Sequence, residues 1–162
     1  MKPLTPEEIR SSIVNASEAE IAAMPLPGLH EVLWDEREFL GWLDPSTRRR
    51  GYLVHWDGDR PVGVMLRSVE PRKGAATAAI CSLCRTQQPY TQVVLFTAAR
   101  AGEAGENGNT VGNYICADLA CSMIIRITPG QSTMHPSDLV RQRSERLTER
   151  VNGFTGEIRR VP

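Results

Sequence analysis

Hydrophobic and polar residues along the chain first indicate a helical N-terminal segment. Thr5 can cap a helix, Pro6 suits the first helical position, and apolar residues at helical spacing continue to Met24. Two prolines then remove helical donors and end this pattern. An aromatic-rich segment follows and stops at Asp44-Pro45. Residues 1–45 are therefore expected to form an N-terminal helical segment.

The next region, residues 46–133, has the short apolar runs that are typical of antiparallel strands. Four strands are expected, at residues 52–56, 62–69, 75–80 and 92–98. The first two flank Asp57-Gly58, a pair that favours a tight hairpin turn. The polar, glycine-rich residues 100–112 are expected to form a loop.

Two helices are expected in the remainder of the chain. The first is predicted to run from Cys116 to about Arg126, before a Pro-Gly pair. The second is predicted over Ser137–Asn152, with Gly153 immediately after its end. Residues 134–162 are therefore expected to form a C-terminal helix and tail.

Length and charge restrict the class of protein. The chain has 162 residues, enough for one domain or for one domain with a small helical extension. It carries 19 Lys plus Arg and 19 Asp plus Glu, and this neutral balance argues against a general nucleic-acid binder. The first residues do not resemble a signal peptide, and no apolar run reaches the roughly 18 residues of a membrane span. We therefore expect a cytoplasmic protein without a membrane partner.

The four cysteines fall into two closely spaced pairs. Two residues separate Cys81 from Cys84, 31 residues follow, and four residues separate Cys116 from Cys121. In a reducing compartment such pairs indicate metal ligands before disulfides. Four thiolates make a closed tetrahedral site, which is typical of one structural Zn²⁺ ion. Two disulfides, four unrelated buried thiols or an iron–sulfur cluster remain alternatives.

The order of elements around the cysteines predicts the class of fold. A knuckle after one strand, a hairpin strand and then a helix with the last ligands are what a treble-clef zinc finger requires. The predicted fold is therefore α+β, with N-terminal helices, a small antiparallel sheet, a treble-clef zinc finger and a C-terminal helix.

Several strings of the sequence resemble one known family. These strings are residues 79–86 (AICSLCRT), 95–102 (LFTAARAG) and 109–122 (NTVGNYICADLACS), with weaker likeness at 39–45 and 62–67. They are similar to the treble-clef domain of the elongation factor G-binding proteins, the FusB-type fusidic acid resistance proteins, in their actinobacterial branch. The resemblance implies a zinc-containing domain that binds elongation factor G and helps it leave the ribosome.

Three arginines near the zinc unit are candidate partner-binding residues. Arg85 follows the knuckle, Arg100 follows the fourth expected strand, and Arg126 ends the expected zinc helix. Arginine is enriched at interfaces, but each of these residues could instead be a solvated surface side chain, or Arg126 could offset the dipole at the C-terminus of its helix. No nucleotide loop, nucleophile elbow or histidine pair at metal spacing occurs. We therefore expect a protein without enzymatic activity or a small-molecule substrate.

A second function remains open from the sequence alone. The run Arg48-Arg49-Arg50 and the arginines of the C-terminal helix could contact RNA. The alternative is therefore an RNA- or ribosome-binding zinc-finger protein without elongation factor G activity.

Overall fold

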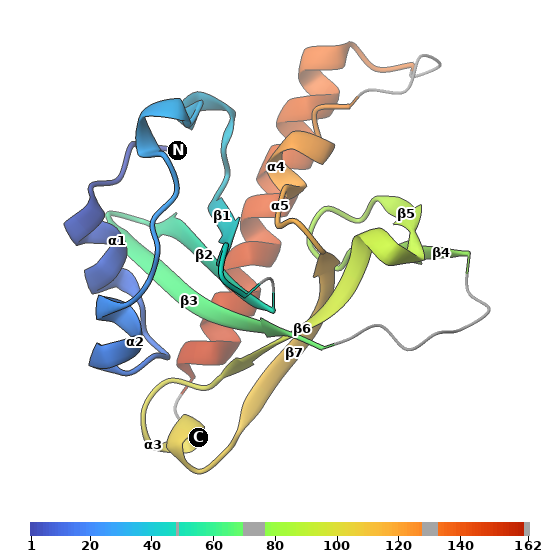
Figure 1. Ribbon diagram of the computed structural model, residues 1–162. Coiled ribbons are helices and arrows are strands. Elements are labelled where there is room, and N and C mark those ends of the chain that lie inside the picture. The colour runs from blue at the N-terminus through green and yellow to red at the C-terminus, as the bar shows by residue number, and fades with distance from the viewer. Residues whose placement is uncertain (48, 70–76, 128–132, 161–162) are drawn as a thin grey trace.

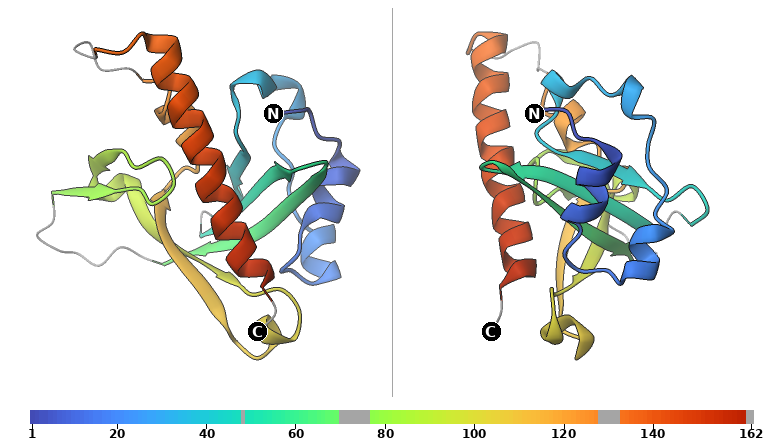
Figure 2. Two further views of the ribbon diagram at one scale, coloured as in Figure 1. Left: turned by 180° about the vertical axis from the view of Figure 1, so that it is seen from behind. Right: turned by 90° about the vertical axis from the view of Figure 1, so that its left-hand side faces the viewer.

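The structure is a computed structural model that describes residues 1–47, 49–69, 77–127 and 133–160. A five-stranded antiparallel sheet of strand order β1-β2-β3-β6-β7 lies at its centre, with helices on both faces (Figure 1 and Figure 2). The strands are β1 (Leu40–Leu43), β2 (Arg50–Asp57), β3 (Arg60–Ser68), β6 (Val93–Ala99) and β7 (Thr110–Cys116). This arrangement confirms the predicted α+β class.

The β2–β3 hairpin forms as its sequence predicts. Its register pairs Asp57 with Arg60 across the turn, and Gly58 has φ of 63°, which glycine adopts at little cost. The strand β1 then pairs with β2, so that Leu40 lies opposite Val54. Residues 1–45 are therefore not wholly helical, because the aromatic-rich segment supplies an edge strand of the sheet.

The N-terminal helix is interrupted, which corrects the expectation of one continuous helix. It consists of α1 (Pro6–Ser12), capped by Thr5, and α2 (Glu18–Ala22), capped by Ser17. Between the two helices the chain leaves helical geometry, because the amide of Val14 donates to the carbonyl of Gly63 in β3. A backbone hydrogen bond to β3 thus divides the segment into two short helices.

Asn15 explains why the interruption occurs at this point. Strands β3 and β6 pair only at Arg67–Thr97 and Ser68–Phe96, and then diverge. The buried Asn15 amide fills the gap: its Nδ2 donates to the carbonyls of Met65 and Ala99 at 3.0 Å each, and its Oδ1 accepts from the Met65 amide at 2.8 Å. The Asn15 side chain therefore makes hydrogen bonds in place of the backbone pairs that β3 and β6 lack at this point.

The C-terminal helix α5 (Pro136–Arg159) is longer than predicted, since it continues through Gly153 and Gly156. Each glycine costs about 1 kcal/mol in a helix interior. The last two turns nevertheless bury Phe154 and Ile158 against the sheet, and this burial outweighs that cost. The helix boundary is thus set by tertiary packing.

Two hydrophobic cores lie on opposite faces of the sheet. One is formed with α5 and includes all four cysteines, and the other is formed with α1 and the segment that follows it. Figure 2 shows α5 and the N-terminal helices on either side of the sheet. The remaining elements outside the cysteine region are a short helix α3 (Glu103–Glu106), within the expected loop, and three 3-10 turns at Leu29–Glu31, Trp34–Glu36 and Tyr90–Gln92. Among the described residues, no helix combines the length and apolar character required to cross a bilayer.

Candidate metal centre

The first cysteine pair lies in a small hairpin of its own. Strands β4 (Ala78–Ile80) and β5 (Gln87–Pro89) pair as a separate two-stranded sheet, and residues 81–86 form the turn between them. Within the turn, the Arg85 amide donates to the Cys81 carbonyl at 2.9 Å, and the Cys84 amide donates to Cys81 Sγ at 3.4 Å. The predicted knuckle is therefore present, with both sulfurs on its inner side.

The second pair spans the end of a strand and the start of a helix. Cys116 is the last residue of β7, and Cys121 is the first residue of α4 (Cys121–Ile124). The expectation of a helix that begins at Cys116 is thus wrong. Residues 117–120 instead form a loop, in which Asp118 Oδ1 accepts from the Ala120 amide at 3.0 Å.

The four sulfurs converge on one buried point. Their Sγ atoms all lie within 4.8 Å of one another, with 3.7 Å between Cys81 and Cys121 and 3.7 Å between Cys84 and Cys116. Four sulfurs about 2.3 Å from a tetrahedral Zn²⁺ would be about 3.8 Å apart. All four residues are buried. The donor set and its spacing therefore fit one zinc ion with no open coordination position.

The thiols influence one another strongly at this distance. Hydrogen bonds from Cys116 and Cys121 lower the pKa of Cys81 to about 7 and hold the pKa of Cys84 well below its ordinary value. The contacts with Cys116 and Cys81 raise the pKa of Cys121 instead. Four negative sulfurs cannot share this volume without a cation, so zinc takes the place of the protons that the thiols would otherwise retain.

Gln88 is a supporting residue that the spacing of the cysteines did not reveal. Its Nε2 lies 3.2 Å from Cys116 Sγ and 3.9 Å from Cys84 Sγ, so the amide donates toward one ligand of each pair. Groups that hydrogen-bond metal ligands orient them and adjust their basicity. The β4–β5 hairpin thus supplies two ligands and also steadies a third.

Replacing Gln88 with leucine should weaken zinc retention while the fold is kept. Leucine has a similar volume but no donor, and the loss of such a supporting contact typically lowers metal affinity about 10–100-fold. Competition with a chromophoric chelator measures this affinity. Gln87→Leu is the matched control, because Gln87 is exposed and, within the part of the chain that the structure describes, makes no hydrogen bond to a cysteine sulfur. Equal zinc retention in the two variants would contradict the assigned role.

Leu119 anchors the loop between the second cysteine pair to the sheet. It is buried and has φ of 58°, an unusual value for leucine. A Cβ atom on Gly41 would lie 2.8 Å from both the Cβ and the carbonyl oxygen of Leu119, and one on Gly51 would lie 3.0 Å from its Cδ1. The loop therefore packs directly over two glycines of β1 and β2, which explains why those positions carry no side chain.

Arg126 makes a buried internal ion pair. Its Nη1 and Nη2 donate to Glu38 Oε2 and Oε1, each at 3.0 Å, and the Ser144 hydroxyl donates to Glu38 Oε1 at 2.7 Å. The Glu38 side chain is 4% exposed and that of Arg126 is 23% exposed. Arg126, which lies just after α4, thereby joins the end of this helix to the segment before β1 and to α5.

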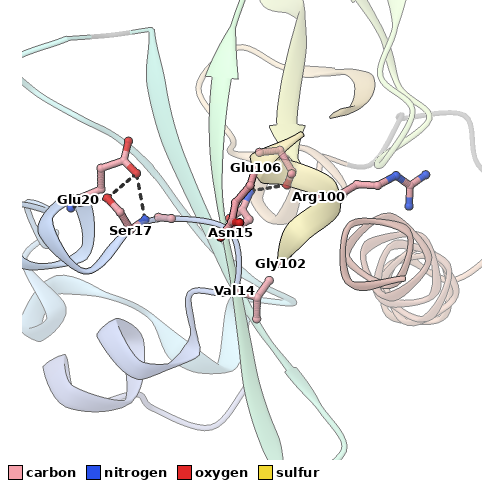
Figure 3. Close-up of a pocket in the computed structure, with 10 residues that line it drawn as sticks. Val14, Asn15, Ser17, Glu20, Arg100, Gly102 and Glu106 are labelled. Atoms are coloured by element: carbon pink, nitrogen blue, oxygen red, sulfur yellow. Dashed lines mark hydrogen bonds between the residues drawn. The ribbon is translucent and has the colours of Figure 1, made fainter. Parts of the chain in front are cut away.

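Arg100 also contacts α5, at a distant point. Its Nη1 donates to the Glu157 carbonyl at 2.5 Å, and Figure 3 shows the side chain extending toward α5, away from Ser17 and Glu20. Glu157 lies 13 residues beyond Ser144, which is about 20 Å along a helix. Arg100 and Arg126 therefore belong to different regions of the molecule. Arg85 is exposed on the knuckle. The role of all three arginines in partner binding stays a prediction.

A cavity of about 270 Å³ lies beside Arg100 (Figure 3). Two of the polar side chains that line it have structural partners: Glu20 accepts from the Ser17 amide and hydroxyl in the cap of α2, and Asn15 bridges β3 and β6. These two side chains therefore stabilise the fold beside the cavity.

The comparison with protein families agrees with this geometry. Residues 8–158 match the family described as FBP C-terminal treble-clef zinc-finger. A solved structure of the fusidic acid resistance protein FusC is similar at 21% sequence identity and a TM-score of 0.47, over 66% of this chain and 51% of FusC. The match thus spans about half of FusC, and no curated protein matches the chain. The four-cysteine centre holds one structural Zn²⁺ ion, and the chain belongs to the FBP C-terminal treble-clef zinc-finger family.

Proposed function

We propose that this protein is a non-enzymatic module that docks on elongation factor G and influences the release of that factor from the ribosome. Family membership supports the proposal, together with the resemblance to elongation factor G-binding proteins in the segments that surround the cysteines. The zinc centre has no open position for water or substrate, so it serves as a rigid support for a binding surface.

An exposed apolar face beside the zinc centre is the observation that carries the proposal. Met123 is 56% exposed and Ile127 is 68% exposed, at positions four residues apart on and just after α4. Ile127 also lines a groove of about 440 Å³, together with Pro89 of the zinc hairpin and Arg143 of α5. Exposed apolar side chains around a groove with an arginine are typical of protein–protein contact sites.

Binding of purified elongation factor G tests the proposal directly. Titration calorimetry with the zinc-loaded protein should detect a complex, whereas no binding at tens of micromolar would refute it. Ile127→Asp should weaken the complex about tenfold or more, because it places a charge in the apolar contact. Val69→Asp is the control, since Val69 is also an exposed β-branched apolar residue but does not line this groove.

A further inference from the structure

The groove between the zinc hairpin and α4 has a composition that restricts what can occupy it. Its apolar lining consists of Pro89 from β5, Ile124 from α4 and Ile127 just after that helix. Arg143 of α5 is the charged residue of the described lining, which includes no carboxylate and no aromatic ring. An occupant therefore meets aliphatic side chains, uncharged polar side chains and one guanidinium group.

Arg143 is held in position by the end of α4. Its Nη1 donates to the carbonyl oxygen of Ile125 at 3.2 Å and to that of Ile127 at 2.9 Å. Carbonyl groups at the end of a helix lack intrahelical donors, and an arginine side chain can satisfy them. The guanidinium group is therefore oriented before any partner arrives.

The other side of the Arg143 guanidinium remains available. Within the described part of the chain, its Nε and Nη2 atoms make no hydrogen bond, and neither atom is sealed from solvent. No carboxylate of that part lies within ion-pair distance of Arg143, because Glu38 pairs with Arg126 and Glu145 pairs with Arg141. Arg143 thus differs from Arg126, whose guanidinium already has its carboxylate.

A carboxylate is the group that matches this free side. The Nε and Nη2 atoms of an arginine can donate two parallel hydrogen bonds to the two oxygens of one carboxylate. The aliphatic surface of Ile124 and Ile127 lies in the same groove, and it is best covered by another apolar side chain. Charge and apolar surface together therefore fit a carboxylate that stands beside an apolar side chain.

The lining favours a protein segment over RNA. Sites for single-stranded RNA hold bases by stacking them on aromatic rings, and the described lining has no such ring. The arginine run at residues 48–50 does not strengthen the case for RNA. Arg48 lies outside the described residues, and Arg50 lies 3.9 Å from the carboxylate of Asp44.

We propose that this groove binds a protein segment in which an apolar side chain stands next to an aspartate or glutamate, and that Arg143 binds the carboxylate. The inference deepens the proposed function and rests on it, since it takes the groove as the contact with a protein partner. Arg143 then determines which segments of the partner are accepted, while Ile124 and Ile127 supply apolar contact area.

Nuclear magnetic resonance titration of the zinc-loaded protein with capped peptides tests this inference without elongation factor G. The probe is a peptide with the central sequence leucine-aspartate-leucine between glycine and serine residues. Two comparison peptides replace the aspartate with asparagine or both leucines with serine. The aspartate peptide should shift the signals of Gln88, Ile127 and Arg143. It should bind about fivefold more tightly than the asparagine peptide, and the serine peptide should also bind more weakly.

Arg143→Gln should remove the preference for aspartate over asparagine and keep the weaker binding of the asparagine peptide. This ratio reports on the charge, so a general disturbance of α4 would not produce the same result. Arg146→Gln is the charge-matched control, because Arg146 is exposed nearly one turn further along α5 and does not line the groove. It should leave the preference unchanged.

Three results would overturn the inference: equal binding of the aspartate and asparagine peptides, a preference that survives in Arg143→Gln, or no signal shift at the groove with millimolar peptide. A short single-stranded RNA that shifts the same signals at lower concentration would overturn the assignment to a protein segment. Calorimetry with elongation factor G separates the two proposals. A preference for aspartate without binding of the factor would refute the proposed function alone, whereas binding of the factor without that preference would refute this inference alone.

Discussion

Replacing Cys121 with alanine should abolish stoichiometric zinc binding and unfold the region around the metal. The four cysteines are buried in the same hydrophobic core as the inner face of α5. Loss of the metal should therefore disrupt this core as well as the loops that carry the ligands. Metal binding by small zinc domains contributes on the order of 10 kcal/mol to folding. This amount is comparable with the whole unfolding free energy of an ordinary domain, about 5–15 kcal/mol.

Zinc content by atomic spectroscopy and thermal unfolding by circular dichroism measure this effect. The wild type should contain one zinc per chain, and a strong chelator should reproduce the thermal behaviour of the variant. Met123→Ala is the control, because Met123 lies two residues further along α4 with an exposed side chain. A Cys121→Ala protein that keeps its zinc and its melting temperature would show that the fourth sulfur is not a ligand.

The zinc ligands could be found from sequence because their signal is local. Two short spacings, Cys81 to Cys84 and Cys116 to Cys121, are sufficient to indicate a shared metal. The supporting residue Gln88 has no such signal. Its role depends on the β4–β5 register, and nothing in the sequence distinguishes Gln88 from the neighbouring Gln87.

The strands β2 and β3 were predictable for the same reason, since apolar runs and Asp57-Gly58 define a hairpin locally. Element boundaries that depend on distant contacts were not. Asn15 ends α1 because it bonds backbone groups about 50 and 84 residues away. Similarly, α5 continues beyond Gly153 because Phe154 and Ile158, which follow this glycine in the sequence, are buried in the core.

Arg126→Met should lower the unfolding free energy by about 3 kcal/mol. Methionine keeps most of the apolar stem but leaves the buried Glu38 carboxylate without its cation. Removing one partner of a buried ion pair typically costs about 3–5 kcal/mol, and the partial exposure of Arg126 favours the lower end of that range. Urea denaturation of the zinc-loaded proteins measures the difference. Arg85→Met is the control, because Arg85 is exposed and should change stability by less than about 0.5 kcal/mol.

The dependence of this difference on pH identifies its cause. Burial alone would raise the pKa of Glu38, but hydrogen bonds from Arg126 and Ser144 outweigh burial and lower it. A lowered pKa in the folded state contributes stability above the unfolded pKa of about 4.3, and this contribution is lost as pH falls through the folded value. In Arg126→Met, burial should dominate and raise the pKa of Glu38. The deficit of the variant should therefore be largest near neutral pH and should shrink as Glu38 becomes protonated, whereas a deficit independent of pH would assign the loss to packing rather than to charge.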